Sequence, residues 1–193
     1  MLRRKNFKLS VLFVFILIAV LSINNAGIQA FGAESAMEAE DMTLEDMLNY
    51  AIEDEYLARA EYELIMEEYD IERPFSNIKR AEERHIEILK PLFEEYGFEI
   101  PEDVASEYVI IPDSLEEIFE IGIQAEIDNI AMYEKFLETD LPEDVERVFI
   151  YLRDGSINHL EAFERGAERG PVGREANSDK RRSNRNRSGK QNN

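Results

Sequence analysis

Apolar residues recur at alternating steps of three and four along four segments of the chain, which is the period of a helix that buries one face. The segments span residues 43–70, 75–97, 114–139 and 142–169. The first has the stripe Leu44, Leu48, Ala51, Glu55, Ala58, Tyr62, Ile65 and Tyr69. We therefore predict an all-α protein built from four long amphipathic helices.

Signals for helix ends support these boundaries. Thr43 precedes the first helix with Asp46 three residues later, and Ser114 and Glu117 repeat the pattern before the third. The links inside each helix pair are short, whereas residues 98–112 form a long connection. Two antiparallel hairpins joined by one long crossover form the topology of a ferritin-like four-helix bundle. Residues 43–170 are predicted to form this single domain, after a linker at 31–42.

Five potential metal ligands interrupt the apolar stripes near the helix midpoints. They are Glu55, Glu82, His85, Glu126 and His159. Burying a carboxylate costs several kcal/mol unless a cation meets it, so three carboxylates at one depth predict a bound metal ion. The alternative is a set of polar residues satisfied within the protein, with the histidines bonded to carbonyls and two glutamates bonded to tyrosines.

Three further polar residues lie close to this level. Tyr62 follows Glu55 by seven residues, and Tyr133 follows Glu126 by the same spacing, which indicates an internal repeat of the hairpin. Each tyrosine is expected either to hydrogen-bond a ligand on another helix or to pack in the core. Ser156, three residues before His159, belongs to the buried stripe of the last helix.

Several of these segments resemble a ferritin-like family known as domain of unknown function 2202, which belongs with the rubrerythrin and ferritin superfamily. The similar segments are residues 53–58, residues 77–85 and, most specifically, residues 155–163. The resemblance implies a carboxylate-bridged metal centre at the five ligands above. A full di-iron pattern needs a glutamate where this chain has Ser156, which leaves three carboxylates and two imidazoles.

The chain has no cysteine, so thiolate sites and disulfides are excluded. Carboxylate and imidazole ligands favour iron, manganese or zinc over ions that prefer soft ligands. With the family resemblance, we expect two iron ions, and one ion held well is the alternative. Forty-two acidic residues oppose 22 Lys and Arg, and nearly all the acidic ones lie between residues 31 and 170. Nucleic acid is therefore not expected as a partner. The sequence leaves open whether the chain forms a homodimer.

The two ends of the chain differ from the predicted domain. Basic residues precede an apolar run over residues 11–21, and small residues follow, which predicts a signal peptide over residues 1–30 and a secreted protein. Cleavage after Ala30 or Ala33 would start the mature chain at Phe31 or Glu34. An uncleaved membrane anchor is the alternative. Residues 171–193 are predicted to be a disordered basic tail, either solubilising or in weak contact with an anionic wall or membrane.

The function predicted from these features is redox chemistry at an iron site, either oxidation of Fe(II) or reduction of peroxide or oxygen. Two alternatives remain open because Ser156 removes one carboxylate. The protein could bind or scavenge metal without catalysis, or it could be a metal-free helical interaction module. The sequence therefore does not decide whether the protein is an enzyme, and it identifies no electron donor.

Overall fold

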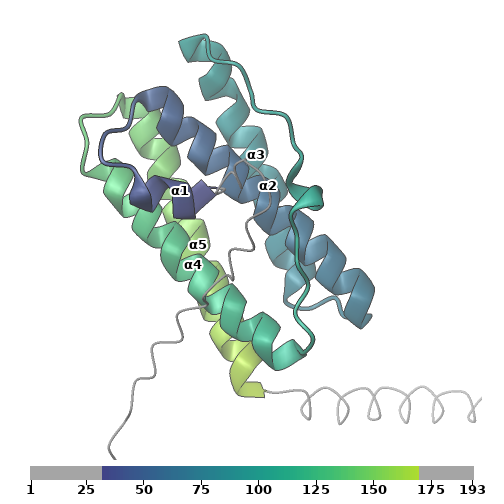
Figure 1. Ribbon diagram of the computed structural model, residues 1–193. Helices are drawn as coiled ribbons and strands as arrows, with labels where there is room; N and C mark the ends of the chain where they lie inside the picture. Colours follow the sequence, from purple (N-terminus) through teal and green to yellow (C-terminus); the bar gives the residue numbers. More distant parts are fainter. Residues whose placement is uncertain (1–31, 170–193) are drawn as a thin grey trace, which may run out of the picture.

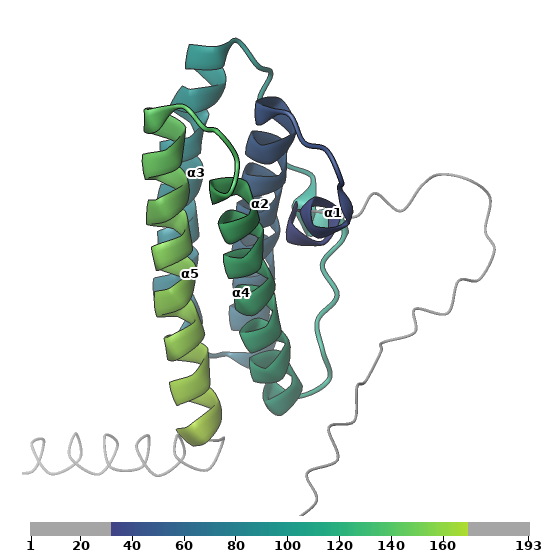
Figure 2. The same ribbon diagram turned by 90° about the vertical axis from the view of Figure 1, so that its left-hand side faces the viewer.

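The computed structural model describes residues 32–169, and that part of the chain is all α-helical with no β-strand. Four long helices match the prediction: α2 (Leu44–Tyr69), α3 (Phe75–Tyr96), α4 (Leu115–Leu137) and α5 (Glu143–Arg169). A short helix α1 (Gly32–Glu38) precedes them, and a 3-10 turn η1 (Ala105–Glu107) interrupts the long connection. Figures 1 and 2 show the four long helices running side by side.

The predicted helix starts are confirmed by their capping contacts. The hydroxyl of Thr43 accepts a hydrogen bond from the backbone N–H of Asp46, whose carboxylate accepts one in return from the backbone of Thr43. The Ser114 side chain likewise accepts a hydrogen bond from the backbone N–H of Glu117. Gly97 ends α3 with φ of 73°, a left-handed conformation that favours glycine.

The four long helices pack as two hairpins, α2 with α3 and α4 with α5. The hairpins meet mainly where α3 touches α5, whereas α2 and α4 approach each other at few positions. Residues 97–114 carry the chain from the end of α3 to the start of α4, and η1 packs against α2 on the way. Figure 2 shows this connection running along the outside of the helices.

The segment predicted to be a linker, residues 31–42, contains helix α1, which packs on both α2 and α4. The backbone N–H of Ala33 donates to a carboxylate oxygen of Asp54 over 3.0 Å. At the other end of α1, the Lys135 ammonium donates to the carbonyls of Ala36 and Ala39 over 2.8 and 2.7 Å. A seven-residue helix has little stability alone, so these contacts with the long helices hold it in place.

Two apolar clusters fill the interior. The larger includes Leu48, Leu89 and Phe149, and the smaller includes Phe75 and Phe163. On α3, α4 and α5 the buried polar residues lie between the segments that contribute to these two clusters. A polar layer therefore separates two apolar cores at the level predicted from the sequence.

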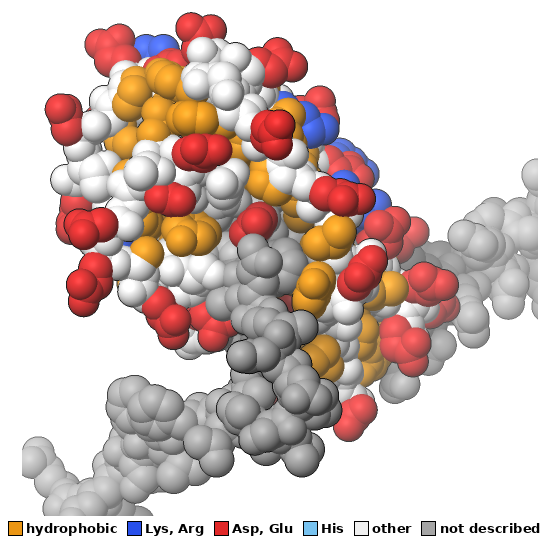
Figure 3. Space-filling model, turned by 45° about the horizontal axis from the view of Figure 1, so that its top comes forward, with side chains coloured by type: hydrophobic (Ala, Val, Ile, Leu, Met, Phe, Trp, Pro, Cys, Tyr) orange, Lys and Arg blue, Asp and Glu red, His pale blue; other side chains and the backbone are white. Residues whose placement is uncertain are grey.

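Within residues 32–169, no helix is long and apolar enough to cross a membrane. The predicted signal peptide over residues 1–30 and the predicted basic tail over residues 171–193 lie outside the described residues. Many carboxylates cover the face drawn in Figure 3, where basic side chains are few and most of them lie along the right-hand edge. This distribution follows the acidic composition of the helical region.

Candidate metal centre

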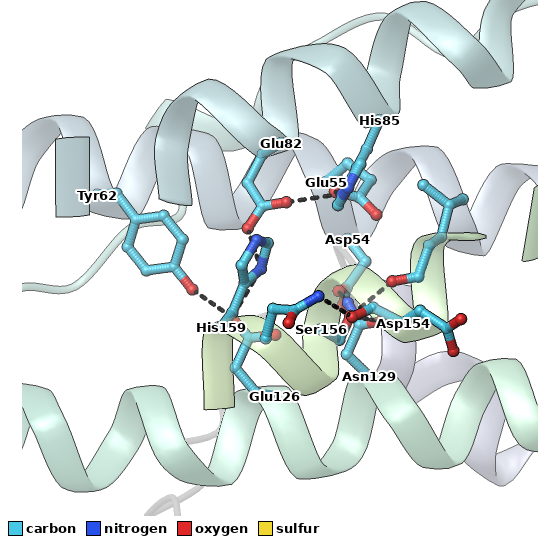
Figure 4. Close-up of polar contacts among 12 residues, drawn as sticks. Asp54, Glu55, Tyr62, Glu82, His85, Glu126, Asn129, Asp154, Ser156 and His159 are labelled. Atoms are coloured by element: carbon cyan, nitrogen blue, oxygen red, sulfur yellow. Dashed lines mark hydrogen bonds and ion pairs between the residues drawn. The ribbon is translucent and has the colours of Figure 1, made fainter. Parts of the chain in front are cut away.

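The structure brings the five predicted ligands together in the interior (Figure 4). Glu55 comes from α2, Glu82 and His85 from α3, Glu126 from α4 and His159 from α5. All five are buried, with at most 7% of their surface exposed. Groups of this charge, taken out of water together, require partners of opposite charge.

Glu82 lies at the centre of the group and faces both histidines. One of its carboxylate oxygens is 2.9 Å from Nδ1 of His85, and the other is 3.1 Å from Nδ1 of His159. A second carboxylate lies near each imidazole: Glu55 at 3.0 Å from His85 and Glu126 at 3.5 Å from His159. The site therefore has two similar halves, joined by one carboxylate.

Each half offers three ligand atoms that lie within 4.8 Å of one another, close enough to hold one cation. The inner half consists of Glu55, Glu82 and His85, and the outer half consists of Glu82, Glu126 and His159. The alternative, in which the protein itself satisfies its buried polar groups, predicts that the histidines bond backbone carbonyls. Both present Nδ1 to carboxylates instead.

The two tyrosines contact the site from opposite sides. The Tyr62 hydroxyl of α2 donates to Glu126 of α4 over 3.1 Å, and the Tyr133 hydroxyl of α4 donates to Glu55 of α2 over 2.9 Å. The expected hydrogen bonds to carboxylates of another helix are therefore present, and they equally match the alternative in which two glutamates are bonded to tyrosines. At Glu55 the tyrosine bonds Oε1 and leaves Oε2 to face His85, whereas at Glu126 the same Oε1 lies near both Tyr62 and His159. Each hydrogen bond orients its carboxylate toward the site.

Burial and the opposing charges shift the pKa values in the site. Burial raises the pKa of the Glu55 carboxyl to about 8, although the neighbouring His85 works in the opposite direction. Burial alone would raise the pKa of Glu82 as well, but hydrogen bonds from both histidines outweigh it and lower this pKa to about 2. Burial alone would lower the pKa of His85 and His159, whereas the facing carboxylates raise both to about 10. The imidazoles thus hold protons that balance the carboxylates.

Ser156 lies beside the polar layer without contributing a carboxylate. Its hydroxyl donates to the side-chain oxygen of Asn129 over 3.2 Å, with the carbonyl of Leu152 also in reach at 3.3 Å. The Asn129 amide in turn donates to Asp54. Burial raises the pKa of this Asp54 to about 7. Neither Asp54 nor Asn129 was predicted as a site residue from the sequence, and Asp54 lies outside the apolar stripe of α2.

Gly155 provides the space for one of the histidines. A Cβ atom at this position would lie 2.7 Å from Cε1 and 2.8 Å from Nε2 of His85, which is too close for any side chain to remain there unmoved. The α-carbon of Gly155 on α5 therefore packs directly on the imidazole of His85 on α3. The family resemblance of residues 155–163 contained this glycine, but only the packing of α3 against α5 gives its physical reason.

Comparison with known proteins confirms the family named in the resemblance. The family model described as an uncharacterized protein domain, DUF2202, matches residues 44–181. The chain belongs to this family. The matched region includes all five candidate ligands and all four long helices.

One relative is an uncharacterized protein of Methanocaldococcus jannaschii, MJ0754. It is 30% identical over 128 residues, which cover 58% of this chain and 69% of the relative. The crystal structure of this archaeal protein, described as hypothetical, superposes with a TM-score of 0.59 at 25% identity and covers 67% of this chain and 83% of the other. The structural match thus covers a larger share of this chain than the sequence match does.

Proposed function

We propose that this DUF2202 protein is a ferritin-like metal protein that binds two divalent ions, iron by preference, and uses them to oxidise Fe(II) or to reduce oxygen or peroxide. The observation that supports it best is the placement of Glu82, which presents one oxygen to each half of the site. Such a carboxylate is suited to bridge two ions, with one imidazole and one further carboxylate for each.

The donor set fits this group of metals. Three carboxylates and two imidazoles are hard and borderline ligands, which suit iron, manganese and zinc. Glu55 and His85 would hold the ion of the inner half, and Glu126 and His159 would hold the ion of the outer half. Bound iron would supply the electrons for reduction of oxygen or peroxide.

The protein residues have separate roles in this proposal. Tyr62 and Tyr133 orient the terminal carboxylates by hydrogen bonds and keep them within reach of the ions. The two apolar clusters exclude water from both sides of the polar layer, which strengthens the electrostatic interactions within it. The histidines must release the protons that they carry in the metal-free protein before they can bind an ion.

Ser156 favours a second candidate function, metal binding without redox catalysis. A full di-iron set has a fourth carboxylate at this position, whereas Ser156 donates its proton to Asn129 and offers no charge. An ion in the site would then keep more water among its ligands and be held less tightly. A protein of this kind could scavenge metal outside the cell.

Metal analysis of protein purified without chelator tests the proposal. We expect the wild type to bind metal stoichiometrically, with a second ion held more weakly than the first because Ser156 supplies no carboxylate. His85→Ala and Glu82→Ala should lose stoichiometric binding. Glu68→Ala, a change of an exposed glutamate on α2, is the matched control and should keep the wild-type metal content. Wild-type metal content in the first two variants would refute the site assignment.

Two further measurements separate the candidate functions. Oxygen consumption on adding Fe(II) to the metal-free protein in air-saturated buffer would support redox chemistry, while binding without oxygen consumption would favour the scavenging function. A metal-loaded protein should also melt at a higher temperature than the metal-free protein, because the ion binds only the folded state and relieves carboxylate repulsion. Identical melting of the two forms would favour the metal-free helical module.

A further inference from the structure

A cleft of about 810 Å³ opens between α2 and α4, where these helices are least closely packed. Helix α1 forms one wall, and Tyr108 and Ile110 of the long connection form another part of the lining. The cleft extends inward to Glu82 and Glu126. It therefore joins the protein surface to two carboxylates that are themselves 2% and 4% exposed.

The cleft reaches the outer half of the site more fully than the inner half. Its lining includes Glu82, which both halves share, and Glu126 of the outer half. Neither histidine lines it, and Glu55, the terminal carboxylate of the inner half, does not line it either. Gly155 covers the imidazole of His85 on its other side. The two halves thus have similar ligands but different access from outside.

The charge of the lining is one-sided. Among the lining residues that the structure describes, seven are acidic and none is lysine, arginine or histidine. Carboxylates that line a cleft with poorly polarisable walls concentrate cations there and repel anions. The chemistry of the lining therefore selects a positively charged ligand.

Glu61 is the acidic residue whose position is most informative. It lines the cleft one residue before Tyr62, and no hydrogen bond or ion pair of its carboxylate is found among residues 32–169. Burial raises its pKa to about 7, and the charges of Asp54 and Glu126 add to this effect. Among the described residues, the contacts of this half-buried carboxylate give it no role in folding.

We propose that this cleft is the route by which a hydrated divalent cation reaches the metal centre, that the outer half is filled first, and that Glu61 binds the cation transiently on the way. The inference rests on the proposed function, because it requires that the centre binds metal. It adds an order of filling and a residue outside the centre that controls the rate of binding.

Association of Co²⁺ with the metal-free full-length protein, followed by stopped-flow absorption, tests the proposal. Glu61→Gln removes the charge, and Ala125→Phe narrows the cleft at an exposed position on α4. We expect each variant to bind Co²⁺ about tenfold more slowly at low ionic strength, with unchanged stoichiometry at equilibrium. The difference for Glu61→Gln should shrink as salt is added, because salt screens the attraction.

Two control variants carry the same chemical changes outside the cleft. Glu67→Gln removes a charge from an exposed position of α2, and Ala167→Phe adds a ring to an exposed position of α5. Both should bind Co²⁺ at the wild-type rate. Equal rates for all four variants, with stoichiometry retained, would overturn the route. Loss of stoichiometry in Glu61→Gln would also overturn it, because Glu61 would then be a permanent ligand.

The same experiment distinguishes a failure of the route from a failure of the proposed function. A wild-type protein that binds no Co²⁺ at equilibrium would refute the metal centre itself. If the wild type binds Co²⁺ and Glu61→Gln and Ala125→Phe bind it at the same rate, the metal centre stands. Only the cleft as its access route is then refuted.

Discussion

The close contact between Gly155 and His85 allows one substitution to test the metal centre without changing any ligand. In Gly155→Ala, the new Cβ would lie 2.7 and 2.8 Å from two atoms of the imidazole. Unbonded carbon atoms prefer about 3.5–4.0 Å, so the ring must shift or rotate by roughly 0.7 Å or more. Its Nδ1 then leaves the position 2.9 Å from Glu82 and 3.0 Å from Glu55.

The effect on metal binding should exceed the effect on stability. Alanine in place of glycine within a helix stabilises it by about 1 kcal/mol, while overpacking costs about 1–3 kcal/mol, so the metal-free protein should lose at most about 2 kcal/mol. Displacing a group that orients a metal ligand typically lowers affinity by about 10- to 100-fold. We expect a loss of this size for one of the two ions.

Calorimetric titration with Co²⁺ and thermal unfolding of the metal-free protein measure both quantities. Gly166→Ala is the matched control, since it lies on the same helix and its Cβ would approach Phe119 to 2.3 Å, away from the metal centre. That variant should lose stability and keep its metal affinity. If Gly155→Ala binds both ions as tightly as the wild type, then His85 is not a ligand in the position described.

Three further predictions concern pH, the fourth carboxylate and export. The facing carboxylates raise the pKa of His85 and His159 to about 10, so metal binding must displace a proton from each imidazole. Metal affinity should therefore rise as the pH increases from 6 to 8. Competition with a chelator measures this affinity, and a value that does not change with pH would contradict the prediction. Ser156→Glu should raise occupancy toward two ions and alter the rate of Fe(II) oxidation, which anaerobic titration of both proteins would show. If the chain is exported as predicted, its mature form should start at Phe31, because cleavage after Ala33 would remove the backbone N–H that holds α1; N-terminal sequencing of the secreted protein decides this.

The parts of the structure that could be predicted from the sequence are those controlled by local periodicity. Helix ends followed from capping residues such as Thr43 and Ser114, and the depth of the polar layer followed from the positions of Glu55 and Glu126 within their helices. Helix α1 could not be predicted in this way. It is too short to show a period, and its contacts with Asp54 and Lys135 are distant in sequence.

The cleft was beyond sequence analysis for a related reason. It exists because α2 and α4 are splayed while each packs closely on its hairpin partner, and that spacing depends on the side chains of several helices at once. Glu61 illustrates the consequence. In the sequence it is one of many acidic residues of α2 that lie outside the apolar stripe. Only its position in the cleft distinguishes it from the solvated carboxylates around it.

Ser156 marks the point where a family pattern needs the structure to be understood. The pattern shows that a carboxylate is absent. It does not show that the Ser156 hydroxyl donates a hydrogen bond to Asn129, or that the Asn129 amide donates one to Asp54. Since Asp54 also accepts the backbone N–H of Ala33, a chain of hydrogen bonds runs from α1 to the wall of the metal centre. A glutamate at position 156 must displace the Asn129 side chain, so its gain in metal binding should be larger in the double variant Asn129→Ala, Ser156→Glu. An equal gain in both variants would show that Asn129 does not compete for the bridging position.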